Sequence, residues 1–241
     1  MKVSDLVANK INRLKAGYVF TYDEFDMPVD KVDALKKTLS RLVAAGKIVR
    51  LSKGQFYKPE KTEFGLLQPP EYQIVKDLLE EKNKIVGYIT GVSIYNKLGL
   101  TTQVSNTIQI GTNIERKPRK RGKYNIRFIR QKNTITKENT YMLQVLDAVR
   151  FINRIPDADV NESCRRIIFI FSNFSQEERI AIVKYALKYN PGTKALAGAI
   201  LEHLSIEDVA DKLYNSLNPA TTFNLKISDE TMPNKHKWRI I

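Results

Sequence analysis

The chain has 241 residues and a formal net charge of +14, from 40 Lys and Arg against 26 Asp and Glu. A hydrophobic content of 42% excludes a disordered polar chain, and the longest purely apolar run, 167–171, is too short to span a membrane. A single cysteine, Cys164, excludes an internal disulfide framework and is typical of a reducing compartment. Because the first residues lack the apolar core of an export signal, we expect a cytoplasmic protein.

The positive charge is concentrated in the first part of the chain. Residues 1–62 carry 13 Lys and Arg against 7 Asp and Glu, residues 63–141 carry 14 against 7, and residues 142–241 carry 13 against 12. A basic region joined to a near-neutral one is typical of a part that binds a polyanion and a part with another task. An acidic protein partner would suit the same charge.

The first 60 residues contain a regular series of short elements. Apolar residues recur at helical spacing over 3–14, residues 18–20 can form a short strand, and a short second helix follows. A third helix over about 30–46 carries a stripe of leucines and ends at a glycine. Residues 47–51 and 55–58 alternate as two strands around a glycine turn. This order predicts a winged helix-turn-helix.

The remaining chain predicts a second domain, so the expected fold class is α+β. Residues 1–60 form the predicted winged-helix domain, and the proline-rich segment 61–70 is expected to be a linker. Residues 71–241 are predicted to form a mixed α/β domain with a basic β-hairpin and a mainly helical C-terminal region.

Within this second domain, the patterns predict a helix over 71–81, a strand over 85–89 and a helix over 92–98. Two alternating segments, 105–113 and 124–130, are expected to pair as a long hairpin. Further helices are predicted over 141–153, 162–173, 176–188, 191–204 and 206–216, and no element is assigned to 223–241.

The third helix carries its cations opposite its leucines. At about 100° per residue, the face opposite the apolar stripe carries Asp30, Ala34, Lys37 and Arg41. Such a face suits a DNA major groove, where Lys and Arg approach phosphates or guanine edges. The alternative is a solvated face whose charges serve solubility. With the predicted wing, the candidate DNA-binding residues are Lys36, Lys37, Thr38, Ser40, Arg41, Arg50 and Lys53.

A second basic cluster lies between the two strands of the expected long hairpin. Six of the eight residues 116–123 are Lys or Arg. At a hairpin tip they would form a mobile arm for a phosphate backbone or a minor groove, whereas a plain solvated loop is the alternative. The candidate DNA contacts of this arm are Arg116, Lys117, Arg119, Lys120, Arg121 and Lys123.

Enzyme chemistry has little support, and we expect no catalytic residue, metal ion or cofactor. His203 and His236 are isolated and lack companions at metal-ligand spacing, and Cys164 has no nearby histidine. Asp157 and Asp159 resemble nuclease metal ligands, but a turn between helices explains them more simply. A metal-dependent nuclease, or a protein-interaction module with a basic docking face, remains as an alternative function.

Two segments resemble a known family. "YVFTYDEF" with "ALKKTLSRLVAAGKIVRLSKGQFYKP", and "TGVSIYNKLGLTTQVSNTIQIGTN", resemble the AbiEi-type antitoxins of bacterial abortive-infection systems, which act in phage defence. The resemblance spans about Tyr18 to Asp147, and its more specific part is Thr90–Asn113, because the wing pattern is common to many winged-helix regulators. The helical region beyond Asp147 lies outside it.

The resemblance implies a two-part transcriptional repressor and antitoxin. In such proteins the winged helix binds inverted repeats in the system's own promoter, and the second domain counteracts a nucleotidyltransferase-like toxin without a stable complex. By position, the residues that would face the operator DNA are Lys36, Lys37, Ser40, Arg41, Arg50 and Lys53.

Overall fold

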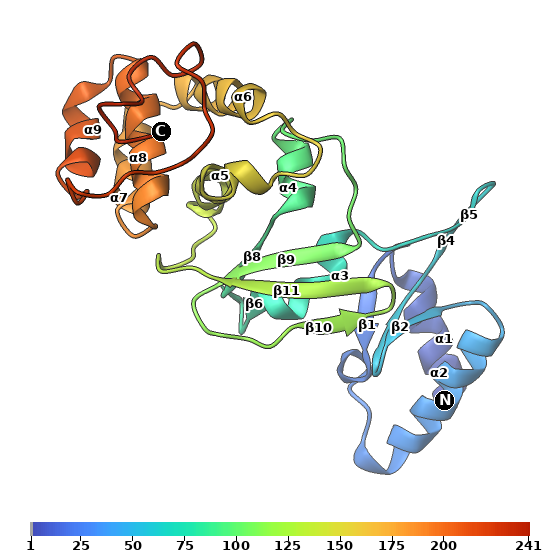
Figure 1. Cartoon of the computed structure of the whole chain (residues 1–241). Coiled ribbons are helices and arrows are strands. Elements are labelled where there is room, and N and C mark those ends of the chain that lie inside the picture. The colour runs from blue at the N-terminus through green and yellow to red at the C-terminus, as the bar shows by residue number, and fades with distance from the viewer. Residues whose placement is uncertain (1) are drawn as a thin grey trace. The chain divides into compact units, whose positions relative to one another are not determined.

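The protein has a mixed α+β fold, seen in a computed structural model that describes residues 2–241 (Figure 1). The chain forms two compact units. Unit 1 contains the residues up to Leu78 together with Lys120–Tyr124, and unit 2 contains Leu79–Arg119 and Asn125–Ile241. Among the described residues, no helix is long and apolar enough to cross a membrane.

Unit 1 begins with two helices and a small antiparallel sheet. Its elements are α1 (Val3–Arg13), β1 (Val19–Thr21), the 3-10 helices Tyr22–Phe25 and Val29–Lys31, α2 (Val32–Ala44), β2 (Val49–Ser52) and β3 (Gln55–Tyr57). The strand order is β1-β3-β2. The predicted short second helix is the 3-10 helix Tyr22–Phe25, which ends at the left-handed Asp26, and the 3-10 helix Val29–Lys31 after Pro28 coincides with the start of the predicted third helix.

The core of unit 1 lies between α1, α2 and the sheet. It is formed by Val7, Ile11, Phe20, Phe25, Leu35, Leu39, Ile48 and Phe56. Each fully buried side chain of this size contributes roughly 1.5–3 kcal/mol to folding. Lys58 also holds this unit together, since its ammonium donates to the carbonyls of Asn12 and Leu14 at 2.8 and 2.9 Å and so caps the end of α1.

The predicted linker is instead a hairpin, and unit 1 extends beyond it. Strands β4 (Glu60–Thr62) and β5 (Gly65–Leu67) pair antiparallel, and prolines flank them rather than interrupt them. The next helix, α3 (Glu71–Leu79), lies in unit 1 up to Leu78. Its Gln73 side chain accepts a hydrogen bond from the Val19 backbone at 3.3 Å. Unit 1 therefore includes the residues from Glu60 to Leu78 as well as the elements before them.

The sheet of unit 2 departs from the predicted long hairpin. Strand β8 (Gly87–Thr90) pairs antiparallel with β9 (Thr107–Thr112), but β9 and β11 (Tyr124–Arg130) run parallel. The hairpin partner of β11 is β10 (Arg119–Arg121), across the two-residue turn Gly122–Lys123, and the strand order is β10-β11-β9-β8. The alternation of apolar and polar residues predicted both β9 and β11. The same alternation occurs in parallel and in antiparallel strands, so it did not determine the direction of their pairing.

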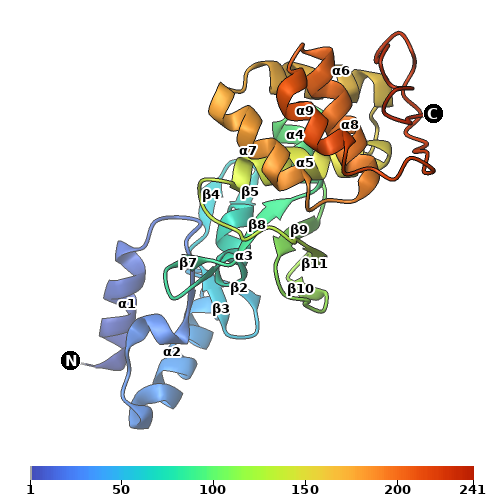
Figure 2. The ribbon, with the colours of Figure 1, turned by 90° about the vertical axis from the view of Figure 1, so that its left-hand side faces the viewer.

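The helices of unit 2 match the predicted ones to within a few residues. They are α4 (Val92–Lys97), α5 (Thr140–Arg150), α6 (Val160–Ser172), α7 (Gln176–Ala186), α8 (Pro191–His203) and α9 (Glu207–Tyr214). Two of the starts have the predicted caps: Ser175 and Glu178 form a capping box at α7, and Asn190 caps α8 with Pro191 at its first position. Figures 1 and 2 show α5, α7, α8 and α9 packed together, with α8 largely buried.

The segment 223–241, for which the sequence patterns predict no element, is ordered against α8. Phe223 and Ile240 form an isolated parallel bridge, and the Trp238 ring lies against Gly198, where a Cβ atom would overlap it. The Trp238 indole nitrogen donates to the Glu202 carboxylate at 2.6 Å. The tail thus completes the core of unit 2.

Candidate nucleic-acid interface

Helix α2 presents a cationic face because its apolar positions are taken by the core. Leu35 and Leu39 are buried, while Ala34, Lys37 and Arg41 on the opposite side are exposed. Among the described residues, neither Lys37 nor Arg41 forms an ion pair with a carboxylate. Both charges are therefore available to an anionic ligand, as the helical periodicity predicts.

The other candidate residues of α2 are not equivalent. Lys36 pairs with Asp33 of the same helix at 3.1 Å, and since both side chains are exposed this pair contributes little and is easily exchanged. The Thr38 hydroxyl donates to the Ala34 carbonyl at 2.8 Å, so mainly its methyl group is left for a ligand. Ser40 is exposed.

The hairpin of β2 and β3 carries the next two candidates at its surface. Arg50 is exposed on β2, in register with the buried Phe56 of β3. Lys53 is exposed in the two-residue turn, whose second residue, Gly54, has a φ of +78°. The Ser52 hydroxyl donates to the Gln55 side chain at 2.7 Å and closes this turn.

The position of Arg121 differs from the predicted mobile basic arm, because its side chain is held inside the protein. Its guanidinium is buried and donates to the two carboxylate oxygens of Asp77 at 2.5 and 2.7 Å, and also to the Ile74 carbonyl at 2.6 Å. All of these partners belong to α3 within unit 1. Arg121 is therefore a structural residue rather than a candidate DNA contact, because its donors are already used inside the protein.

This anchoring places part of the basic cluster beside the β2–β3 hairpin. At Gly122, which has a φ of +53°, a Cβ atom would lie 3.3 Å from the Leu51 carbonyl of β2. Lys120 and Lys123 flank this point within unit 1 and are exposed. Unit 2 contains the other three cations of the cluster, of which Lys117 and Arg119 are exposed and Arg116 is partly buried.

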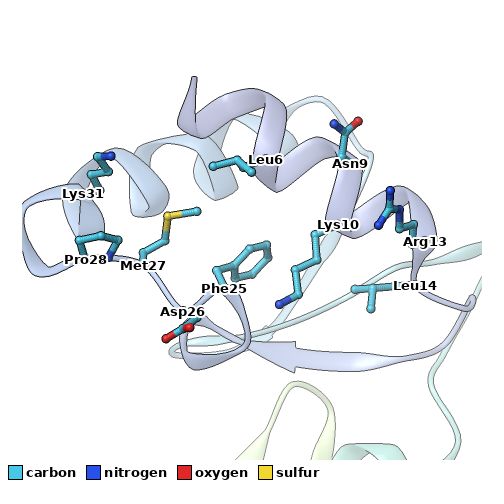
Figure 3. Close-up of a pocket in the computed structure, with 10 residues that line it drawn as sticks. All are labelled: Leu6, Asn9, Lys10, Arg13, Leu14, Phe25, Asp26, Met27, Pro28 and Lys31. Atoms are coloured by element: carbon cyan, nitrogen blue, oxygen red, sulfur yellow. The ribbon is translucent and has the colours of Figure 1, made fainter. Parts of the chain in front are cut away.

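Unit 1 also contains a cavity of about 740 Å³ that the sequence patterns did not predict (Figure 3). Leu6 and Lys10 of α1 face Phe25 and Met27 across it, and Lys31 lies at one end. The Lys10 ammonium lies 5.5 Å from the centroid of the Phe25 ring. These residues come from α1 and from the segment between β1 and α2, so no single motif marks them.

The candidate residues for enzyme chemistry have structural roles. Asp159 caps α6 and accepts from the backbone of Asn161 and Glu162 at 2.9 Å each, and Asp157 accepts from the Gln103 amide. Burial raises the pKa of the Cys164 thiol to about 12, which makes it a poor nucleophile. Among the side chains that the structure describes, no three His, Cys, Asp or Glu come together as a metal site.

Known proteins share the fold of this chain and part of its sequence. The crystal structure of the RV2827C protein from Mycobacterium tuberculosis has a similar fold, with a TM-score of 0.61 and 13% sequence identity over 91% of this chain and 83% of that chain. Among curated proteins there is no match. Residues 6–181 match a family of unknown function, DUF6088, and because this match covers more than half of the chain, the protein belongs to that family.

Proposed function

We propose that unit 1 is a winged helix-turn-helix that binds double-stranded DNA. In this proposal α2 is the recognition helix in the major groove, and the β2–β3 hairpin is the wing beside it. The observation that carries the proposal is the exposed Lys37 and Arg41 face of α2, opposite the buried Leu35 and Leu39 and without an ion pair to any described carboxylate. Arg50 and Lys53 extend the positive charge from this helix onto the hairpin.

The cations divide into two roles by their placement. Lys37 and Arg41 project from the middle of α2, where such side chains reach guanine O6 and N7. Lys53 and Lys123 lie in turns, and Lys120 lies in the short strand β10, so we assign all three to phosphate contacts that carry no sequence information. Thr38 adds a methyl group, because its hydroxyl is bonded within the helix.

We further propose that the protein represses its own promoter and counteracts a nucleotidyltransferase-like toxin. The support is the resemblance to AbiEi-type antitoxins over Tyr18 to Asp147, together with the division into a basic unit and a larger unit. Inverted repeats would engage two copies of unit 1. In this account the chain performs no catalysis, and unit 2 is responsible for the effect on the toxin.

A matched pair of double variants tests the DNA-binding proposal. Lys37→Ala with Arg41→Ala should weaken binding to DNA from upstream of the gene by at least about tenfold, since each good base contact is worth about 1–3 kcal/mol. Lys2→Ala with Lys15→Ala removes the same charge from exposed positions outside α2 and the hairpin, and should have a much smaller effect. Equal losses from the two pairs would contradict the proposal.

The antitoxin part has its own test. Cells that express the toxin gene adjacent to this one should stop growing, and this protein, supplied from an unrelated promoter, should restore growth. The Lys37→Ala with Arg41→Ala protein should restore growth as well, because neutralisation is assigned to unit 2. Failure of the unmodified protein to restore growth would overturn the antitoxin proposal and leave DNA binding standing.

A further inference from the structure

Unit 2 contains a small cavity lined by four cations from three separate segments. The cavity has a volume of about 220 Å³. Arg130 lies at the end of β11, Lys132 follows it, Arg150 lies in the last turn of α5, and Lys188 lies between α7 and α8. Gln131, Tyr189 and Asn190 complete the lining, which contains no acidic side chain.

None of the four cations forms a direct ion pair with a carboxylate in the part of the chain that the structure describes. None of the ion pairs found between residues 2 and 241 involves Arg130, Lys132, Arg150 or Lys188. Four like charges around one cavity repel one another, and solvent screens only part of this repulsion. An anion bound among them would offset that repulsion.

The carboxylate behind the cavity, Asp147, attracts Arg150 but forms no direct ion pair with it among the described residues. Asp147 is fully buried, and its two oxygens accept from the hydroxyls of Tyr88 at 2.8 Å and Tyr189 at 3.1 Å. Burial raises the pKa of both tyrosines, so they stay protonated and serve as donors. The hydrogen bonds of Asp147 thus come from neutral groups. Burial raises the pKa of this carboxyl, the nearby Arg150 charge partly opposes that rise, and the Arg150 guanidinium contacts the Phe151 ring.

The floor of the cavity is polar and held in place. The Gln131 amide donates to the hydroxyls of Tyr88 at 2.9 Å and of Tyr189 at 2.7 Å. Its oxygen accepts from the backbone and the side chain of Asn133 at 2.8 and 3.0 Å. Because these bonds fix Gln131 and Tyr189, the floor of the cavity is already ordered, and the ordering cost of binding a ligand falls on the Lys and Arg side chains around it.

Asn190 adds a further favourable field. It is the N-terminal cap of α8, a helix of thirteen residues, and the positive end of the helix dipole therefore lies at Asn190. This partial charge supports the binding of an anion, although the four full charges dominate.

We propose that this cavity binds the terminal phosphate of a small phosphorylated molecule. A terminal phosphate carries about −1.5 to −2 charges and three acceptor oxygens, which matches several cations better than a carboxylate does. Arg130 and Arg150 can each offer two parallel donors to its oxygens. The cavity is smaller than the roughly 300–1,000 Å³ of sites that enclose a whole ligand, so it takes the phosphate and leaves the rest of the molecule outside.

The test uses the full chain and two simple probes, inorganic phosphate and pyrophosphate. Titration calorimetry at constant ionic strength, balanced with potassium chloride, should show saturable binding with one site per chain. Arg150→Gln and Lys188→Gln should each weaken pyrophosphate binding by about tenfold or more, which is the size expected for one charged hydrogen bond. Lys188 is exposed, so its replacement leaves the fold intact.

Lys184→Gln is the matched control, since Lys184 is an exposed cation on α7 that does not line the cavity. It should change the affinity by less than about twofold. Absence of saturable binding, or equal losses from Lys184→Gln and Lys188→Gln, would overturn the proposal.

A further binding experiment distinguishes a small phosphorylated ligand from the phosphate backbone of DNA. Arg150→Gln and Lys188→Gln should leave binding to a DNA duplex unchanged within about twofold. Loss of duplex binding in these variants, without pyrophosphate binding in the unmodified protein, would assign the cavity to DNA and overturn the proposal. This inference does not depend on the proposed role of unit 1, because its residues all lie in unit 2.

Discussion

Arg121 and Asp77, 44 residues apart in sequence, are joined by two parallel hydrogen bonds of 2.5 and 2.7 Å. The guanidinium is almost fully buried, while half of the Asp77 side chain remains exposed. This pair fixes the turn between β10 and β11 to α3, and so joins a remote piece of the chain to unit 1. The most basic stretch of the sequence is therefore anchored at its tip.

We expect Asp77→Ala to lower the free energy of unfolding by about 1–3 kcal/mol, because it leaves the buried Arg121 guanidinium without its carboxylate. Arg121→Lys should lose a similar amount, since an ammonium cannot form the paired bonds. Urea denaturation followed by circular dichroism measures both changes. Lys120→Ala, at an exposed neighbouring position, should stay within about 0.5 kcal/mol of the unmodified protein. A loss as large from Lys120→Ala would refute the special role of the pair.

Lys120→Ala with Lys123→Ala should weaken binding to every DNA duplex alike, because we assign both residues to phosphates. The slope of log affinity against log salt should fall by about 0.9 for each phosphate that is no longer neutralised. Fluorescence anisotropy with upstream and scrambled duplexes measures the slope. The comparison pair, Lys15→Ala with Lys61→Ala, removes equal charge elsewhere on unit 1 and should leave the slope nearly unchanged. Weaker binding to the upstream duplex alone would show that Lys120 and Lys123 read bases.

The pH dependence of stability should contain a contribution from Asp147. Burial raises its pKa to about 6, against an ordinary value of 3.8, and the hydrogen bonds from Tyr88 and Tyr189 only partly oppose this rise. Because the folded state holds the proton more tightly than the unfolded state, stability is greatest below the ordinary pKa and is lost as the pH rises through 6. Between pH 5 and pH 7.5 the loss from this group should be about 1–2 kcal/mol.

The Asp147→Asn variant isolates this contribution. Its neutral amide resembles the protonated acid, and Tyr189 has a second acceptor in the Leu143 carbonyl at 3.2 Å. Urea unfolding at pH 5 and pH 7.5 should therefore show a smaller decrease for Asp147→Asn than for the unmodified protein. Identical decreases in the two proteins would show that the carboxyl titrates with the same pKa in both states.

The tail after α9 should be required for the stability of unit 2. Trp238→Ala is expected to cost about 3–5 kcal/mol, because it empties the space over Gly198 and removes a donor to Glu202. Phe169→Ala, at an exposed position of α6, should cost much less. Thermal unfolding followed by circular dichroism distinguishes the two. In the unmodified protein the single tryptophan also reports on the tail, and its fluorescence should shift to the red as the tail separates from α8.

The helices and their exposed faces could be predicted from the local pattern of apolar and capping residues. The stripe of Leu35 and Leu39 placed α2 and its exposed face, and the caps at Ser175 and Asn190 placed the starts of α7 and α8. These features depend on residues within one or two turns of each other, so a single sequence contains them.

Features that join distant segments were not predictable in this way. The burial of Arg121 depends on Asp77, the parallel pairing of β9 and β11 depends on the path of the chain between them, and the cavity in unit 2 combines Arg130, Arg150 and Lys188. In each case the partners lie too far apart in sequence for any spacing rule to relate them. The basic run 116–123 predicts a charged surface but not which of its members turns inward.

The most direct test of the central claim is the affinity of the unmodified protein for DNA from upstream of its own gene, compared with a scrambled duplex of the same composition. Fluorescence anisotropy at several salt concentrations would measure both affinities. We predict a preference for the upstream duplex that persists as the salt concentration rises, because base contacts depend less on counterion release than phosphate contacts do. Equal affinities that fall together with salt would contradict sequence-specific binding by α2 and leave only a basic surface.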